Sequence, residues 1–123
     1  MHTERIKYIS INISNVRFIG FEILMKYFLR SIEVLHITTR SDQSYLDAQR
    51  WEQLILSSMP NLRVFNFNNH NHLEMVNPET YHDIVKQFTS RFWIERQWFF
   101  THQHKWQGTD IESGIFYSTN PYR

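Results

Sequence analysis

The sequence of 123 residues contains no cysteine and only three glycines and three prolines. Without cysteine, the protein has no disulfide, no thiolate ligand for a metal and no cysteine nucleophile. Small secreted domains commonly rely on disulfides, so the composition favours a cytoplasmic or nuclear location. Because glycine and proline are scarce, long flexible linkers are not expected, and residues 1–123 are predicted to form a single domain.

Long apolar runs and a strong net charge are also missing. No apolar run approaches the roughly 20 residues that cross a bilayer, and the charged, then alternating N-terminal segment is not typical of a signal peptide. The formal net charge of +1 gives no general attraction to nucleic acid or to an acidic membrane. Hydrophobic residues make up 41% of the chain, which is too many for a disordered protein. We therefore expect a protein partner, and neither nucleic acid nor membrane.

One short hydrophobic pattern occurs three times in the chain. It starts at Ile6, Ile32 and Leu62, and in each copy the first, fourth and sixth positions are hydrophobic. Segments with helical periodicity lie between the copies, so each unit reads as strand, loop and helix. Strands that are joined through helices run parallel, with right-handed crossovers. The pattern predicts an α/β fold in which residues 1–90 form a short leucine-rich-repeat-like array of three strand-helix units with a parallel sheet.

The three predicted helices have recognisable ends and apolar stripes. We expect the first over residues 16–30, after a cap at Asn15, and the second up to Met59, after a cap at Ser44 or Asp47. The third begins at Pro78, because Asn77-Pro78 is a typical helix start. The expected inward-facing residues are Phe21, Leu24, Met25 and Phe28; Ala48, Trp51, Leu54, Ile55 and Ser58; and Tyr81, Ile84, Val85 and Phe88.

Residues 91–123 depart from the repeat pattern and are rich in aromatic residues. We predict that residues 91–105 form one long strand and residues 115–119 a short one, and that the two pair as a β-hairpin. This segment is expected to cap the array and to bury its rings over the last repeat, since terminal segments of repeat proteins are atypical. A second interpretation, in which the aromatic rings form a docking site for a partner, remains open.

A half-covered parallel sheet would have one face open to a partner. Successive side chains of a strand point to opposite faces, so the hydrophobic positions of the three copies lie under the helices and the residues between them form the other face. Polar residues at these positions argue against a sheet that is covered by helices on both faces. The predicted partner-binding residues are Tyr8, Ser10, Asn12, Val34, His36, Thr38, Val64, Asn66 and Asn68.

The repeats also resemble a known family. Leu62-Arg-Val-Phe-Asn-Phe after Met59-Pro60-Asn61, and Ile32-Glu-Val-Leu-His-Ile after Arg30-Ser31, are similar to leucine-rich repeats. The period of 26 to 30 residues with a full helix resembles the repeats of F-box/leucine-rich-repeat proteins, and residues 45–67 and 92–123 are similar to the C-terminal part of such proteins. The resemblance implies a non-enzymatic module that recognises substrates for a ubiquitin ligase.

Several residues depart from the family pattern. The asparagine that usually follows the last hydrophobic position by three residues is replaced by Ser14, Arg40 and His70, and aromatic residues replace leucine in the third repeat. No F-box is present in these 123 residues. The chain therefore resembles a partial member that keeps the recognition surface of the family but not its connection to the ligase.

Two His-x-His pairs, His70/His72 and His102/His104, suggest an alternative function. Alternate residues of a strand share a face, so either pair could bind zinc, and convergence of the pairs in one pocket would favour a small metal-binding protein or a hydrolase. Seven histidines in 123 residues make such pairs frequent by chance. The sequence has no Gly-x-Ser-x-Gly motif and no glycine-rich phosphate loop. We predict no enzyme activity, no catalytic residue, no cofactor and no metal site.

The first predicted strand, residues 6–13, has no preceding strand to pair with. An unpaired edge strand is a template for pairing with another chain. We therefore expect self-association through this N-terminal edge.

Overall fold

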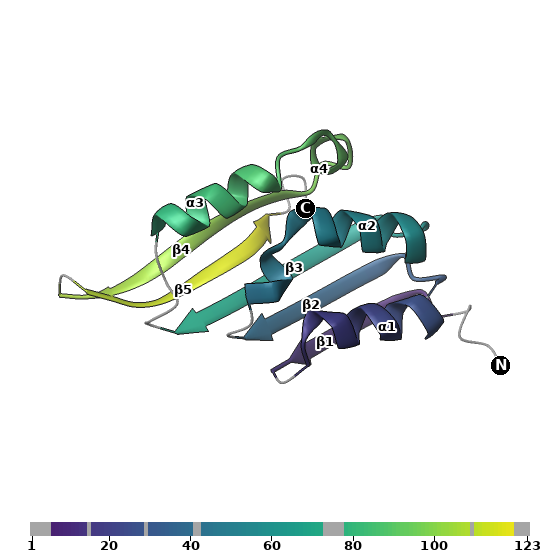
Figure 1. Ribbon diagram of the computed structural model, residues 1–123, viewed down its shortest axis with the longest axis horizontal. Helices are drawn as coiled ribbons and strands as arrows, with labels where there is room; N and C mark the ends of the chain where they lie inside the picture. The colour runs from purple at the N-terminus through teal and green to yellow at the C-terminus, as the bar shows by residue number, and fades with distance from the viewer. Residues whose placement is uncertain are drawn as a thin grey trace.

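The computed structural model describes residues 6–14, 16–28, 30–40, 43–72, 78–108 and 110–119. The fold is α/β, with its helices on one side of a five-stranded mixed sheet (Figure 1). In chain order the elements are β1 (Tyr8–Ile13), α1 (Phe18–Phe28), β2 (Val34–Arg40), the 3-10 helix η2 (Gln43–Leu46), α2 (Ala48–Ser58), β3 (Val64–His72), α3 (Pro78–Gln87), α4 (Arg91–Glu95), β4 (Phe99–Gln107) and β5 (Asp110–Thr119). The expected caps Asn15 and Asn77, and the side chain of Phe28, lie outside the described residues.

The three strands that carry the repeated pattern are adjacent and parallel, as predicted. Ile9 pairs with Leu35 and Leu35 with Phe65, so the fourth positions of the pattern form one column across the sheet. The sixth positions form a second column of Ile11, Ile37 and Phe67. The β2 and β3 members of both columns are buried, because α1 and α2 cover this face of the sheet.

The helix α2 follows the sequence prediction closely. All five residues that were expected to face inward are buried. Asp47 is the N-cap, and its side chain accepts a hydrogen bond of 3.1 Å from the backbone N–H of Arg50, which satisfies one of the free donors of the first turn. Trp51 is fully buried at the centre of the core, where its ring contacts Phe65 and Phe67 at centroid distances of 4.8 and 5.3 Å.

The prediction for α1 is wrong at one position. Phe21 and Met25 are buried as expected, but Leu24 is 43% exposed, and Phe18 is buried instead. The ring of Phe18 lies 4.8 Å from that of Trp51, and this contact with α2 decides which side of α1 faces the core.

The helix α3 presents its predicted stripe to the sheet. Tyr81 and Phe88 are buried, and Ile84 and Val85 are half-buried and pack against the core. Because α3 lies over β4 (Figure 1) and the ring of Phe88 after it contacts that of Phe116 of β5 at 5.1 Å, the described helices cover the sheet along most of its width.

The C-terminal segment differs from the prediction in two ways. Residues 91–105 do not form one strand, because Arg91–Glu95 is the helix α4, which buries Phe92 and Trp93. Gln97, with φ at 58°, follows this helix, and β4 starts only at Phe99. The second strand is also longer than predicted and lies between β3 and β4, antiparallel to both. The described sheet is therefore mixed, although the part formed by β1, β2 and β3 is parallel.

Candidate interaction surface

The side of the sheet away from the helices, here called the outer face, carries the nine predicted partner-binding residues. Strand pairing places them in three rows, each with one residue from β1, β2 and β3. The rows are Tyr8, Val34 and Val64; Ser10, His36 and Asn66; and Asn12, Thr38 and Asn68. The β1 members are exposed and the others are half-buried by their neighbours in the sheet. This arrangement follows directly from the alternation of side chains along each strand.

Contacts within the outer face connect all three strands. The rings of Tyr8 and His36 lie 5.4 Å apart, and 2.7 Å separates Nδ2 of Asn66 from Nδ1 of His36. An amide nitrogen is only a donor, so Nδ1 of His36 is the acceptor in this hydrogen bond. The carboxamide oxygen of Asn66 is buried and has no hydrogen-bond partner among the described residues. These contacts hold the side chains of neighbouring strands in fixed positions.

The outer face continues over β5 and β4, an extension that the sequence prediction missed. Tyr117 lies beside Asn68, and Ile115 lies between His70 and Gln103. The signal was present in the sequence, since Ile115 and Tyr117 flank the buried Phe116. It was not used, because the position of β5 next to β3 cannot be read from the chain order.

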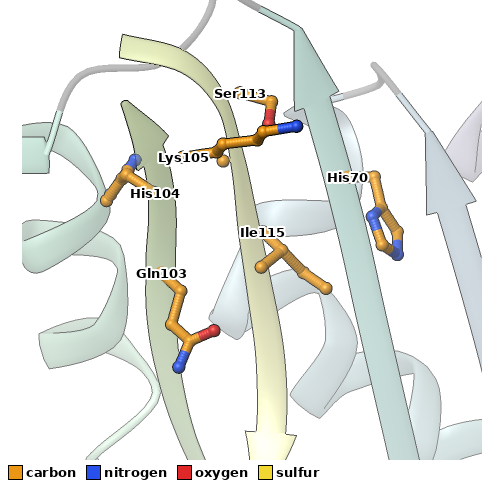
Figure 2. A pocket seen from close by; sticks show the side chains of 7 residues that line it. His70, Gln103, His104, Lys105, Ser113 and Ile115 are labelled. Atoms are coloured by element: carbon orange, nitrogen blue, oxygen red, sulfur yellow. The ribbon is translucent and has the colours of Figure 1, made fainter. Parts of the chain in front are cut away.

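A shallow hollow lies on this extension, at the end of the sheet where β4 and β5 are joined. Figure 2 shows side chains from β3, β4 and β5 around it. It is bordered by His70, Gln103, Lys105, Ser113, Gly114 and Ile115, and also by His104, whose ring lies on the opposite side of the sheet. Burial lowers the pKa of His70, and the neighbouring Arg40 lowers it further, so this imidazole is neutral at pH 7. Among the described side chains of the outer face there is no carboxylate.

The second histidine pair lies on the opposite side of the sheet. The rings of His102 and His104 contact Tyr81 of α3 at centroid distances of 5.8 and 5.1 Å. Nδ1 of His102 and Nε2 of His104 are 2.8 Å apart and share a hydrogen bond. Burial lowers the pKa of both imidazoles; His82 lowers that of His102 further, and His102 that of His104. These two rings therefore help to attach α3 to β4.

His70 of the first histidine pair does not lie on the same side of the sheet as the second pair. His70 alternates with the buried Asn69, so its side chain is on the outer face, whereas His102 and His104 are under α3. The side chain of His72 lies outside the described residues. Within the part of the chain that the structure describes, no three His, Cys, Asp or Glu side chains are placed to hold a metal ion.

Comparison of the chain with protein-family profiles, with curated proteins and with solved structures finds no match. None of the helices in the described ranges has both the length and the apolar character needed to cross a membrane.

Proposed function

We propose that this protein is a recognition module that binds a partner protein on the outer face of its sheet. The proposal rests mainly on one observation, which is that the nine predicted residues form three complete rows on a face that no described helix covers. A folded sheet presents its side chains at fixed spacings, so a partner that binds there loses less free energy to the ordering of this surface.

The residue types on the outer face are suited to contact with a protein. Tyr8 and His36 offer rings, Asn66 offers a carboxamide, and Val34 and Val64 offer small apolar patches between them. Interfaces combine aromatic anchors with polar groups that form hydrogen bonds to the partner. The low net charge of the chain favours a protein over nucleic acid as the partner.

We further propose that the three strand-helix units are a short leucine-rich-repeat-like array and that β4 and β5 form its hairpin cap. The support is the repeated pattern and its resemblance to the repeats of F-box/leucine-rich-repeat proteins. On this proposal the protein is intracellular and its partner belongs to the proteins that such modules present to a ubiquitin ligase. A recognition role of this kind needs no catalytic residue and no cofactor.

Introduction of negative charge on the outer face tests the proposal. We expect the double variant Ser10→Glu with Asn66→Glu to fold and to lose its partner, because a buried interface does not tolerate two unpaired carboxylates. The matched control is Gln53→Glu with Gln87→Glu, which places the same charges at exposed positions of α2 and α3. The measurement is affinity capture with mass spectrometry for the three proteins in parallel, with thermal unfolding as the test of folding.

The result that supports the proposal is a protein captured by the wild type and the control but not by the outer-face variant. If a captured protein is retained equally by all three, the outer face is not the binding surface. If the outer-face variant no longer unfolds cooperatively, the single variant Ser10→Glu, at an exposed position of β1, replaces it in the comparison.

A further inference from the structure

The helix α1 is apolar on the side that faces away from the core as well as on the side that faces it. Its eleven residues include only two charged ones, Glu22 and Lys26, and Glu22 is paired with Arg50 of α2 at 2.8 Å. Large apolar side chains of α1 and of the residue two positions before it are between 43% and 68% exposed. These are Val16, Leu24 and Tyr27, together with Ile19 and Ile23, which border a hollow shared with α2. The proposal below therefore depends on the side of α1 that carries Leu24. A helix that is hydrophobic all round is usually covered on all sides.

The core is incomplete beneath α1, at the β1 edge of the sheet. Ile9, Ile11 and Ile13 belong to the core side of the sheet but are only half-buried, whereas the next members of their columns, such as Leu35 and Ile37, are buried. The other edge differs, because Phe100 of β4 is buried against Phe88 of α3 and Trp93 of α4. The core-side residues are therefore less buried at the β1 edge of the sheet than at the β4 edge.

The backbone of β1 also has an open side. The N–H of Val34 donates to the carbonyl of Lys7 at 2.9 Å, and the direction of backbone groups alternates along a strand. The N–H and C=O groups of Tyr8, Ser10 and Asn12 therefore point away from β2. In the described sheet β1 is the end strand. It contains neither a charged residue nor a proline, which are the usual means of protecting an edge strand.

We propose that this edge binds a second copy of the same chain. The β1 strands of the two copies pair antiparallel across a two-fold axis that is perpendicular to the sheet. Such an axis keeps the helices of both copies on the same side, so α1 of one copy packs against α1 of the other. The two open features, a strand edge and an apolar helix flank, are thereby covered together by one symmetric contact.

The properties of β1 favour a second copy as the occupant. An isologous contact requires a surface that is complementary to itself, and a strand without charges brings no like charges together at the axis. The open positions are Tyr8, Ser10 and Asn12, and we place the axis beside Ser10, the middle one. Ser10 then faces Ser10 of the second copy, and Tyr8 faces Asn12 of the second copy. The sheet then continues through the axis and the half-buried isoleucine columns of the two copies become neighbours.

The size of the contact sets the expected affinity. A surface as long as β1 and as deep as one strand layer and one helix layer measures roughly 20 Å by 20 Å, or about 400–500 Å² per copy. Two such surfaces bury about 900 Å² together, which is typical of weak and transient complexes. We therefore expect a dimer with a Kd on the order of 10–100 μM.

Salt should strengthen this dimer. Arg17 before α1 and Arg30 after it are exposed, and antiparallel packing brings the start of one α1 near the end of the other. Because these charges repel, screening them favours association, and the Kd should fall between about 0.05 M and about 0.5 M salt.

Sedimentation velocity over a range of protein concentrations tests the proposal. The wild-type chain should shift from monomer to dimer, and Leu24→Glu on α1 should weaken the dimer at least tenfold. The matched control is Leu56→Glu, because Leu56 is also an exposed leucine but lies on α2; it should dimerise like the wild type. A chain that stays monomeric at about 500 μM, well above the expected Kd, overturns the proposal. Equal weakening by the two variants also overturns it, as does a Kd that rises with salt.

A disulfide test examines the position of the axis. Since the chain has no cysteine, Ser10→Cys introduces a single thiol. Directly opposed residues of an antiparallel pair have Cα atoms about 4.5–5.5 Å apart, which is within the range of disulfides. Mild oxidation should therefore give a covalent dimer of this variant, while Ser57→Cys on the exposed side of α2 should remain a monomer. Equal cross-linking of both variants would contradict a two-fold axis at β1. These measurements do not involve a partner protein, so their outcome is independent of the proposed function.

Discussion

The carboxamide of Asn66 donates a hydrogen bond to the imidazole of His36, with 2.7 Å between Nδ2 and Nδ1, across the boundary between β2 and β3. The two residues are also direct neighbours in the strand register. This pair lies in the central row of the outer face and links β2 and β3 by their side chains. It is therefore both a small contribution to stability and a fixed feature of the proposed recognition surface.

Removal of the acceptor tests this relationship. His36→Leu leaves the half-buried amide of Asn66 without its partner, and we expect the free energy of unfolding to fall by about 1 kcal/mol. The double variant His36→Leu with Asn66→Leu removes donor and acceptor together and should recover part of this loss, since an apolar pair needs no hydrogen bond. Urea denaturation of the two variants and the wild type provides the comparison. A larger loss in the double variant would contradict the hydrogen bond.

Trp51 is expected to be the most sensitive position of the core. It is fully buried, contacts the rings of both Phe65 and Phe67, and donates from Nε1 to the carbonyl of Tyr45 at 2.7 Å. Trp51→Ala should lower the free energy of unfolding by about 3–5 kcal/mol, which is enough to unfold a marginally stable domain.

The control for this substitution is Trp106→Ala. Trp106 is 57% exposed, so its removal should change the free energy of unfolding by less than about 0.5 kcal/mol. Thermal unfolding followed by circular dichroism separates the two variants. Similar midpoints for both would contradict the central position of Trp51.

The cap of α2 supports a third prediction. Asp47 accepts a hydrogen bond from the N–H of Arg50, and Asp47→Ala should lower the free energy of unfolding by about 1 kcal/mol. Asp47→Asn keeps an acceptor at the same position and should stay close to the wild type, because asparagine caps helices about as well as aspartate. The measurement is the denaturant midpoint of the wild type and of the two variants. Equal destabilisation by Asp47→Ala and Asp47→Asn would argue against a capping role for Asp47.

The histidines under α3 predict a loss of stability in weak acid. Burial lowers the pKa of His102 and of His104 in the folded protein, while in the unfolded chain both titrate near their ordinary pKa of about 6.5. Above about pH 6.5 both states are neutral and stability is complete. As the pH falls below this value, the unfolded state binds protons first, so the free energy of unfolding decreases until the folded pKa is passed. Glu79, His82 and Asp83 of α3 line the cleft beside His102 and modulate the size of the effect.

The measurement for this prediction is urea denaturation at about pH 7.5 and at about pH 5.5, a range in which ordinary carboxylates stay ionised. The variant His102→Gln with His104→Gln removes both groups and should show a smaller decrease than the wild type. The decrease in the free energy of unfolding that remains in that variant includes the contribution of His70, whose pKa is also lowered. A decrease of the same size in both proteins would show that the histidines under α3 are not responsible.

The parallel part of the sheet could be predicted because three hydrophobic positions recur in the same order. Burying Ile9, Leu35 and Phe65 under one helix layer excludes a register shifted by one residue, since such a shift would turn both columns outward. The alternating positions then form the outer face, so the nine candidate residues followed from the same pattern.

The start of the C-terminal segment could not be predicted from residue pattern. Phe92 and Trp93 are compatible with a strand or a helix, and the choice depends on contacts with distant residues. Trp93 packs against Phe88 and Phe100 at centroid distances of 4.9 and 5.4 Å, and a helical turn brings it there. Short apolar stretches are ambiguous for this reason.

Local residue pattern thus decided the repeated strands, the inner face of α2, and which residues of β1, β2 and β3 share a face, and it narrowed the cap of α2 to Ser44 or Asp47. Those features depend on periodicity and on hydrogen bonds between near neighbours in the chain. Tertiary contacts decided the rotation of α1, the helix α4, the place of β5 between β3 and β4, and the separation of His70 from His102 and His104. These depend on which distant surfaces meet, because burial of large aromatic side chains outweighs the small preferences of single segments.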